Sequence, residues 1–424
     1  MTPYRALYSL ALYLLLPLQF WRLWRRGVEL PAYRQRWRER LAFGPALPAG
    51  PRLWVHAVSV GEVNAAAPLI ERLLAQSGTR LLVTTTTPTG SDTVLQRFGG
   101  RVDHVYFPYD LPGAIRRFLR RVQPAALVVM ETELWPNCFH GCRQRGIPVV
   151  LVNARLSDKS LRGYRRLAAL SRSTLACIDR IFAQDQADAE RFVALGAERS
   201  RIEVIGNLKF DCRVADEAVR QGRALRRRWR AHSFVWIAAS THPGEEAQVI
   251  EAHRRVLAQI DDALLIIAPR HPDRFDAVAR QCRDSGLSWA RRTMADPVTE
   301  VTKIYLADTL GELDLLYAAA DVAFVAGSFA DIGGHNPLEP AACARPVLSG
   351  PVVRNFAQIY RRMTEAGAAQ IVADPPALAQ HLLALAADET ARSEAGARAL
   401  AFIQQNAGGV DTVTEYIHSI AGRD

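Results

Sequence analysis

The amino-acid sequence predicts an α/β protein with two doubly wound, Rossmann-like domains that face a cleft, preceded by an N-terminal membrane-anchoring helix. Three observations lead to this prediction. Short, nearly continuous apolar runs alternate with amphipathic stretches, and they do so in two series along the 424 residues. A polar, arginine-rich stretch separates the two series, and a run of uncharged residues precedes both. Nearly continuous apolar strands that alternate with helices are typical of parallel sheets covered on both faces.

The length and composition of the chain narrow the possible classes of protein. A chain of 424 residues exceeds the size of one compact core, so we expect two domains of about 150–200 residues each. With 49% hydrophobic and 23% charged residues, the composition excludes a mainly disordered, collagenous or polytopic membrane protein. Of the six cysteines, only Cys138 and Cys142 lie close together, so we expect reduced thiols, no disulfide and no structural metal.

The N-terminal segment has the features of a membrane anchor. Ala6 to Trp21 is uncharged, and several arginines follow it between Arg22 and Arg40. Because the charge follows the apolar run, a cleaved signal peptide does not fit, whereas a buried core helix remains an alternative. We expect an uncleaved anchor helix over residues 1–28, with the arginines on the cytoplasmic, anionic-lipid side. Since a full span needs about 20 apolar residues, it stays open whether this helix crosses the bilayer or lies in the interface.

The first series of elements begins at residue 53. Strands are expected where apolar runs are bounded by turn residues, at 53–58, 81–85, 102–107, 125–130 and 149–153. Helices are expected where apolar residues recur at helical spacing, at 61–76, 111–122 and 136–145. These elements make up a domain predicted for residues 29–212.

The second series forms a domain predicted for residues 213–424. Its strands are expected at 235–239, 264–268, 322–326 and 346–348. The segment 213–233 is polar, rich in arginine and without a strand pattern, so we place the hinge near residues 208–232 and interpret the arginines as a solvated helix face. Ligands of such folds bind at the carboxyl ends of the parallel strands, in loops that lead into helices.

The charge of the chain points to an anionic partner. The 53 Lys and Arg residues outnumber the 43 Asp and Glu residues, which gives a net charge of +10. Phosphates, nucleic acid and acidic lipid would all suit this charge. Because the strands lack the interleaved aromatic and basic pattern of RNA-binding domains, we expect no nucleic-acid partner.

One carboxylate stands where the first strand leads into the first helix. In the segment from His56 to Glu62, Gly61 permits a tight turn and Glu62 lies in the first helical turn. The helix dipole there favours the ionised carboxylate, which can act as a general base on a substrate hydroxyl. The alternative, that Glu62 only complements the helix N-terminus, stays open.

Two more carboxylates and a lysine lie at the ends of predicted strands in the first half. Glu131 and Glu133 directly follow the strand at 125–130. Strand alternation would point both to one side, where like charges raise one pKa unless a cation intervenes. Lys209, one of three lysines, could neutralise a carboxylate or phosphate at the border between the domains. A capping role for the glutamates and a surface position for the lysine remain alternatives.

The loops of the second half carry residues suited to phosphate. Arg270 follows the strand at 264–268 in a loop fixed by two prolines, and its side chain can contact phosphate in a bidentate way. The glycine-rich segment 327–340 lets backbone N–H groups approach an anion, and Glu339 within it can accept hydrogen bonds from sugar or ribose hydroxyls. Neither a Walker A motif nor a G-x-G-x-x-G motif is present, which disfavours an ATPase or a dehydrogenase.

Ordered motifs along nearly the whole chain resemble those of the 3-deoxy-D-manno-octulosonic acid (Kdo) transferase family. They are SVGE at 59–62, ETELWPN at 131–137, GNLKFD at 206–211, PRHP at 269–272 and GGHNPLE at 333–339. The segments AYRQRW at 32–37 and PYDLP at 108–112 also fit. The sequence departs from the family pattern at Leu310, where a methionine is expected, and this change still permits a backbone contact.

The resemblance implies a GT-B glycosyltransferase fold and an inverting, metal-independent transfer of Kdo from CMP-Kdo to a lipid A precursor, lipid IVA. It places the protein on the cytoplasmic side of the inner membrane of a Gram-negative cell, with the acceptor bound by residues 29–212 and the donor by residues 213–424. Glu62 would deprotonate the acceptor hydroxyl, and Glu131 and Lys209 would stabilise the transition state. CMP would be held by Pro269, Arg270, Leu310, Gly311, Glu312, Asn336, Pro337, Leu338 and Glu339. The alternative is another GT-B glycosyltransferase, or an epimerase, that uses a UDP-sugar.

Overall fold

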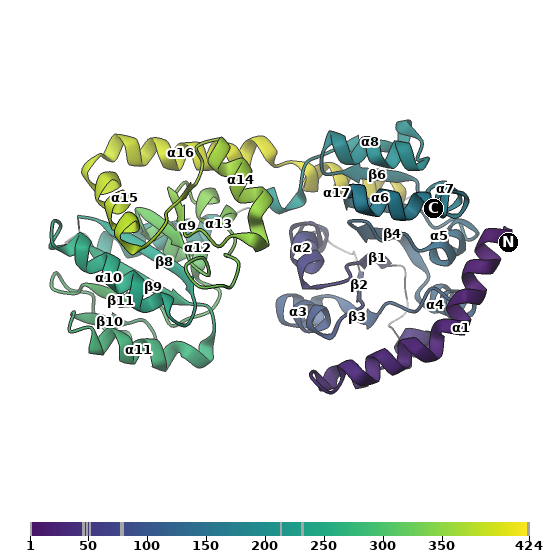
Figure 1. Cartoon of the computed structure of the whole chain (residues 1–424), viewed down its shortest axis with the longest axis horizontal. Helices are drawn as coiled ribbons and strands as arrows, with labels where there is room; N and C mark the ends of the chain where they lie inside the picture. Colours follow the sequence, from purple (N-terminus) through teal and green to yellow (C-terminus); the bar gives the residue numbers. More distant parts are fainter. Residues whose placement is uncertain are drawn as a thin grey trace. The chain divides into compact units, whose positions relative to one another are not determined.

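The chain divides into two compact units (Figure 1). The computed structural model describes residues 2–44, 47, 50, 52–76, 80–212, 214–229 and 233–421. The first unit contains residues 1–211 and 407–424, and the second contains residues 212–406. Residues 213 and 230–232 of the predicted hinge, and residue 1 of the predicted anchor, lie outside the described residues.

The first unit is built on a parallel sheet of seven strands. Their order is β3-β2-β1-β4-β5-β6-β7, so the order reverses between β1 and β4 and the carboxyl ends of these two strands form a topological switch point. The strands are β1 (Arg52–His56), β2 (Leu81–Thr85), β3 (Asp103–Tyr106), β4 (Pro124–Met130), β5 (Val149–Ala154), β6 (Arg180–Ala183) and β7 (Ile202–Val204). The helices of this unit are α1 (Pro3–Arg26), α2 (Val60–Leu74), α3 (Pro88–Phe98), α4 (Pro112–Val122), α5 (Pro136–Arg143), α6 (Asp158–Arg165), α7 (Ala168–Leu175), α8 (Gln186–Leu195) and α17 (Gly409–Ala421), with short 3-10 turns η1 (Pro31–Arg34) and η5 (Leu208–Phe210).

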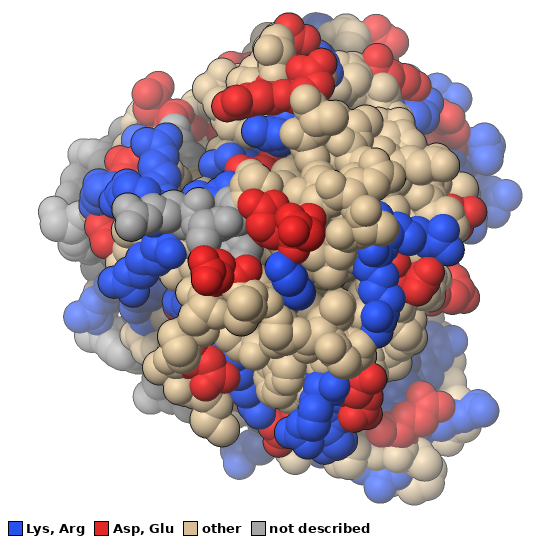
Figure 2. Space-filling view, turned by 90° about the vertical axis from the view of Figure 1, so that its left-hand side faces the viewer, with Lys and Arg blue, Asp and Glu red and all other residues tan. Residues whose placement is uncertain are grey.

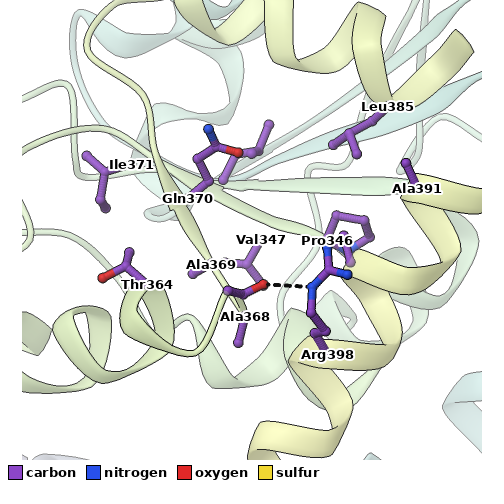
Figure 3. Close-up of a pocket in the computed structure, with 13 residues that line it drawn as sticks. Pro346, Val347, Thr364, Ala368, Ala369, Gln370, Ile371, Leu385, Ala391 and Arg398 are labelled. Carbon is purple, nitrogen blue, oxygen red and sulfur yellow. Dashed lines mark hydrogen bonds between the residues drawn. The ribbon is translucent and has the colours of Figure 1, made fainter. Parts of the chain in front are cut away.

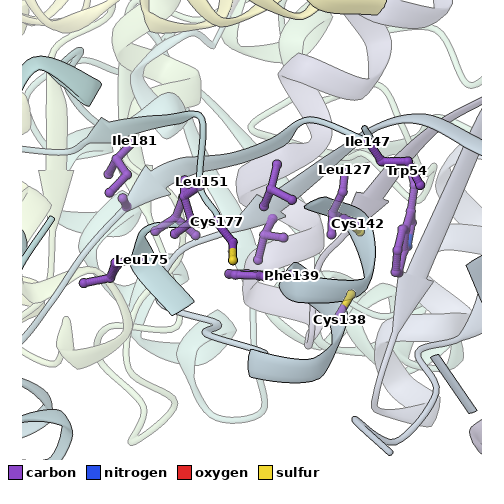
Figure 4. Packing of buried hydrophobic residues seen from close by; sticks show 14 of the residues in the cluster. Trp54, Leu127, Cys138, Phe139, Cys142, Ile147, Leu151, Leu175, Cys177 and Ile181 are labelled. Carbon is purple, nitrogen blue, oxygen red and sulfur yellow. The ribbon is translucent and has the colours of Figure 1, made fainter. Parts of the chain in front are cut away.

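Alternate residues of the central strands pack into different cores on the two faces of this sheet. Trp54 and Leu127 belong to one cluster, whereas their neighbours Val55 and Val128 belong to the other. Figure 4 shows the first cluster, in which Trp54 and cysteine side chains lie among aliphatic residues. All six cysteines are free thiols, and only Cys212 is partly exposed. Burial on both faces explains why these strands read as continuous apolar runs.

The second unit repeats the arrangement with its own seven parallel strands. Their order is β10-β11-β9-β8-β12-β13-β14, so its switch point lies between β8 and β12. The strands are β8 (Val235–Thr241), β9 (Leu264–Pro269), β10 (Trp289–Arg291), β11 (Ile304–Leu306), β12 (Val322–Val325), β13 (Val347–Ser349) and β14 (Gln370–Ile371). The helices are α9 (Asp216–Arg228), α10 (Glu245–Leu257), α11 (Phe275–Asp284), α12 (Leu313–Ala319), α13 (Leu338–Ala342), α14 (Ala357–Glu365), α15 (Pro375–Ala387) and α16 (Glu389–Asn406). Two doubly wound α/β units, as predicted, are therefore present.

The second unit ends earlier than the predicted domain of residues 213–424, because residues 407–424, which include the C-terminal helix α17, belong to the first unit. Helix α17 contacts α2, and its residues Val410, Val413 and Ile417 are buried in the same core cluster as α2. The Asp211 carboxylate accepts hydrogen bonds from the backbone N–H groups of Gly408 and Val410 at 2.6 and 3.0 Å. Helical spacing of apolar residues indicates an amphipathic helix, but it does not show which sheet the helix covers.

Helices α9 and α12 pack closely where α9 has Gly222. A Cβ atom at this position would lie 2.4 Å from the Leu315 carbonyl oxygen and 2.6 Å from the Ala318 Cβ. We therefore expect Gly222→Ala to lower the free energy of unfolding by about 1–3 kcal/mol, as overpacking does elsewhere. Chemical denaturation would measure this, with Gly163→Ala in α6 as control. Apart from the glycine itself, its two chain neighbours and the nearby backbone of its own helix, no atom lies within 4 Å of a Cβ built at Gly163, so equal losses in both variants would contradict the steric explanation.

Candidate functional site

Glu62 lies at the topological switch point of the first unit. It occupies the first turn of α2, directly after β1, and is only 9% exposed. Its Oε2 atom accepts a hydrogen bond of 2.7 Å from the backbone N–H of Val58. Burial, together with the charges of Glu133 and Glu131, raises the pKa of Glu62 to about 8, although the Val58 N–H opposes the shift. Burial has the largest effect, so the net shift is toward the protonated form, opposite to the direction in which the helix dipole acts.

Glu131 and Glu133 lie on the other side of the same switch point. β4 ends at Met130, and Glu131 has a φ angle of +55°, so strand alternation does not set the direction of these side chains. The Glu131 N–H donates to the Val152 carbonyl at 2.9 Å. Burial, and then the charge of Glu131, raises the pKa of Glu133 to about 7, which is the direction expected for neighbouring carboxylates. A non-glycine residue at positive φ is uncommon and is often found at functional sites.

Lys209 lies in η5, which rests on the carboxyl end of β5. Asn153, near the end of that strand, accepts a hydrogen bond of 3.1 Å from the Leu208 N–H. The Asn207 side chain accepts one of 3.0 Å from the Lys209 N–H, and η5 packs against α2. Because β1, β4 and β5 are neighbours in the sheet, Glu62, Glu131 and Lys209 all lie at the carboxyl ends of the central strands.

His56, the last residue of β1, is not a candidate base. His56 is fully buried, its ring stacks on Phe107 with centroids 4.0 Å apart, and its Nδ1 lies 3.1 Å from the Thr84 carbonyl oxygen. Because that carbonyl accepts a hydrogen bond, Nδ1 carries the proton of a neutral ring. Burial lowers the pKa of His56 to about 3. Glu62 is therefore the group at this strand end whose pKa suits proton transfer near neutrality.

The residues predicted to hold a nucleotide follow three strands of the second unit. Arg270 follows β9, is exposed, and donates its backbone N–H to the Thr241 carbonyl at 3.1 Å. Glu312 follows β11, after Leu310 and Gly311, and both of its oxygens accept hydrogen bonds of 2.6 Å from Arg292. These bonds hold the pKa of Glu312 below its usual value, so its carboxylate stays ionised and already has a cationic partner.

The segment from Asn336 to Glu339 forms a compact turn after β12. The Asn336 side chain donates to Glu339 Oε1 at 3.1 Å and accepts from the Leu338 N–H at 3.2 Å. Pro337 caps α13, which is only five residues long. This turn fixes the direction of the Glu339 carboxylate, and the side chain remains partly exposed to solvent.

Comparison with known proteins decides the family. A family model for 3-deoxy-D-manno-octulosonic-acid transferase matches residues 35–212. The chain is 39% identical over 396 residues to the 3-deoxy-D-manno-octulosonic acid transferase of Haemophilus influenzae, covering 92% of both chains. It is also 39% identical over 424 residues to that of Bordetella pertussis, covering 95% of this chain and 96% of the relative.

The chain belongs to the Kdo transferase family. It is therefore a glycosyltransferase of lipopolysaccharide core biosynthesis. A solved UDP-GlcNAc 2-epimerase from Neisseria meningitidis, 14% identical, covers 88% of this chain and all of its own, with a TM-score of 0.52. That likeness shows the fold alone, and it agrees with the predicted GT-B architecture of two doubly wound units.

Sequence reasoning missed Glu245, which lies at the switch point of the second unit of this Kdo transferase. Its fully buried carboxylate accepts hydrogen bonds of 2.8–3.0 Å from four backbone N–H groups, those of His242, Gly327, Ser328 and Phe329. Part of the glycine-rich segment expected to approach an anion therefore already binds a carboxylate of the chain itself. The signal was available, because Gly244-Glu245 follows a strand and begins a helix, as Gly61-Glu62 does in the first half.

Two histidines of the second unit, His242 and His335, were not predicted from sequence either. The Nε2 atoms of His242 and His335 lie 2.8 Å apart, and the two rings are stacked at 5.0 Å. Burial, together with the neighbouring cations, lowers the pKa of His335 to about 4, so the pair holds a proton between two neutral rings. The pair joins the loop after β8 to the glycine-rich segment in the family motif GGHNPLE.

Two other parts of the described surface, the face seen in Figure 2 and a hollow beside β14, lack the clustered polar residues of the candidate sites. The face seen in Figure 2 carries basic and acidic side chains interspersed, so the described residues there form no continuous basic stripe of the kind that binds nucleic acid. A hollow of about 520 Å³ beside β14 is lined largely by apolar residues, and Arg398 at its rim donates to the Gly367 carbonyl (Figure 3). None of the predicted site residues lines this hollow.

Proposed function

We propose that this Kdo transferase transfers Kdo from CMP-Kdo to a lipid A precursor, lipid IVA, with inversion and with Glu62 as the general base. The observation that carries the proposal is the Glu62 carboxylate, held by the Val58 N–H at the switch point of the first unit with a pKa of about 8. A base with a pKa near the working pH is effective in proton transfer. The motifs SVGE, ETELWPN and GNLKFD, in which Glu62, Glu131 and Lys209 stand, resemble those of the family and give further support.

The proposed reaction is a single displacement. The acceptor hydroxyl gives its proton to Glu62, its oxygen forms a bond to the anomeric carbon of Kdo, and the bond from that carbon to the phosphate oxygen of CMP breaks. Glu131 and Lys209 stabilise the charge that develops in the transition state. Positive charge that develops at the anomeric carbon is favoured near carboxylates.

The second unit is proposed to hold the donor. Arg270, which is exposed, can bind the CMP phosphate, so the proposal includes no metal ion. The adjacent Pro269, the Leu310–Glu312 segment and the Asn336–Glu339 turn complete the CMP site, with Glu339 accepting hydrogen bonds from the ribose. Because Glu312 is paired with Arg292, its contribution is to fix the loop whose backbone contacts CMP.

We place the protein on the cytoplasmic side of the inner membrane. Helix α1 is long and apolar enough to cross a membrane by length and composition, and its most apolar window has a mean hydropathy of 1.3 with 11% of the window buried. An insoluble glycolipid acceptor requires that the enzyme works at the bilayer surface. The arginines that follow α1 favour an anionic cytoplasmic leaflet.

The test is the release of CMP from CMP-Kdo with and without lipid IVA. Release that depends on the acceptor would establish donor and acceptor together, and analysis of the anomeric linkage in the product would establish inversion. Absence of acceptor-dependent release from folded protein would contradict the proposal. The alternative, an enzyme that uses a UDP-sugar, predicts that UDP raises the melting temperature more than CMP does.

The pKa of Glu62 predicts the pH dependence of the reaction. The base works in its deprotonated form, so kcat/KM should rise with pH and level off above about pH 8. Steady-state rates measured between mildly acidic and alkaline pH would show this. A profile that is flat between pH 6 and 8 would assign the base to a group with a lower pKa.

A further inference from the structure

One side of α1 is joined to the first unit by polar contacts. The Tyr8 hydroxyl donates to Asp110 Oδ2 at 3.1 Å. The Asn137 side chain donates to Ser9 Oγ at 3.0 Å, while Ser9 donates to the Arg5 carbonyl within α1 at 2.8 Å. Arg5 and Ser9 are 8% and 4% exposed, so this part of the apolar helix is buried through its polar residues.

The other end of α1 is attached as well. The Phe20 ring packs against Trp37 and Tyr109, with centroids 5.3 and 5.8 Å apart, and Leu23 is buried. From Arg5 to Leu23 a helix extends about 27 Å, at 1.5 Å per residue. Helix α1 is therefore attached to the first unit near both of its ends, and it contacts α5, α7 and η1 (Figure 1).

Asp110 makes this attachment costly to break. Its carboxylate is 2% exposed and also accepts hydrogen bonds from the Asn137 and Cys138 N–H groups, at 2.9 and 2.7 Å, where α5 begins. Burial raises the pKa of Asp110 to about 7, although these bonds oppose the shift. If Tyr8 moved away, the buried Asp110 carboxylate would lose one of its hydrogen-bond donors, which is unfavourable.

The opposite side of α1, which we call the apolar face, exposes large apolar side chains, whereas helices of water-soluble proteins usually bury theirs. Its exposed large side chains recur three or four residues apart and are Tyr4, Leu7, Leu10, Leu14, Leu18 and Trp21. Leu7 and Leu14 are 67% and 73% exposed. The last turn adds Arg25, whose guanidinium lies 5.7 Å from the Trp21 ring, and Arg26. Apolar and aromatic residues bordered by arginines are typical of helices that bind anionic lipid surfaces.

We propose that α1 lies parallel to the surface of an anionic bilayer, with its apolar face in the lipid, and does not cross the membrane. This inference rests on the proposed attachment of the protein to a membrane. A crossing helix would have to take Tyr8, Ser9 and Phe20 away from Asp110, Asn137 and Trp37, or carry these polar groups into hydrocarbon. Either change is unfavourable, because polar groups in the bilayer core must be paired within the protein.

The parallel orientation also suits the acceptor. Asn137, which binds Ser9 of α1, is the last residue of the ETELWPN motif that contains Glu131. The lipid surface would thus lie next to the unit that carries the proposed base. A glycolipid could then reach this unit while its acyl chains remain in the bilayer.

Spin labels on the apolar face would test the orientation. Leu7→Cys, Leu14→Cys and Trp21→Cys lie on one side of the helix, since seven residues are nearly two turns. They would be made in the full chain with Cys212→Ser, because the other five cysteines are buried. The labelled proteins would be bound to vesicles of phosphatidylethanolamine and phosphatidylglycerol, and depth would be read from collisions with oxygen and a water-soluble nickel complex. Ala247→Cys, on an exposed position of α10, serves as the control outside the lipid.

A parallel helix predicts similar, shallow depths at all three positions, about 5–10 Å into the boundary between headgroups and acyl chains. A label at position 14 near the bilayer centre, with shallow labels at 7 and 21, would overturn the inference. Flotation with the vesicles reports attachment separately. Protein that floats but shows the deep central label refutes only the orientation, whereas protein that does not float refutes the proposed membrane attachment and this inference with it.

Discussion

Glu62→Gln is expected to lower acceptor-dependent CMP release by about 10²–10⁴-fold, the usual contribution of a general base. Glutamine keeps the shape of the side chain and can still accept the hydrogen bond from the Val58 N–H. Binding of CMP, measured by calorimetry, should be unchanged. Glu71→Gln, on the exposed side of the same helix, is the matched control and should retain activity. Full activity in Glu62→Gln would assign the base to another group, with Glu131 or Glu133 as the next candidates.

The same variant should not lose stability at alkaline pH. Because the folded protein holds the pKa of Glu62 near 8, well above its value in the unfolded chain, the folded state binds more protons between about pH 4.5 and 8. The wild-type protein therefore loses stability as the pH rises through this range. The glutamine side chain of the variant does not titrate, so thermal denaturation at pH 8.5 should show a melting temperature equal to or above that of the wild type. A marked decrease would contradict the shift in pKa.

Glu245→Ala should be among the most destabilising single substitutions in the second unit. It removes a fully buried acceptor and leaves the N–H groups of His242, Gly327, Ser328 and Phe329 without it. A buried donor left without its partner costs about 1–3 kcal/mol, and four donors are affected here. Since this carboxylate fixes the start of the glycine-rich segment, we also expect weaker binding of CMP, measured by calorimetry below the melting temperature.

Glu251→Ala provides the comparison on the same helix. Glu251 is about half exposed and pairs with Arg255 one turn away, at 3.1 Å. Exposed pairs of this kind contribute at most about 1 kcal/mol. Equal losses of stability in Glu245→Ala and Glu251→Ala would show that the four hydrogen bonds do not stabilise the loop.

The central strands were predictable from sequence because both faces of each sheet are covered. β4 and β8, for example, are continuous apolar runs, and the predicted 125–130 and 235–239 lie within their observed bounds. The two edge strands of the second sheet were missed for the opposite reason. β10 (Trp289–Arg291) and β14 (Gln370–Ile371) are two or three residues long and partly exposed, so they lack an apolar run that could be recognised.

Some candidate site residues could be named from sequence because packing does not explain their positions. A pair of carboxylates directly after an apolar strand, as at Glu131 and Glu133, has no packing reason and therefore drew attention. The pKa of Glu62 was not predictable, because it depends on burial by residues distant in sequence rather than on the helix in which it lies. The position of Glu245 after a strand could have been noted from sequence, but its hydrogen bonds to residues 327–329 could not, because these partners come together with it only in the folded sheet.

The return of α17 to the first unit has a consequence for synthesis on the ribosome. The second unit is an insertion of roughly 200 residues between the first sheet and the helix that covers part of it. At about 5–20 residues per second, these residues take roughly 10–40 s to emerge. During that time the apolar surface of α2 that Val413 and Ile417 later bury has no cover from α17. The nascent chain is thus expected to need chaperone protection late, after most of its first sheet has formed, and a premature stop that removes only the last helix should leave an aggregation-prone product.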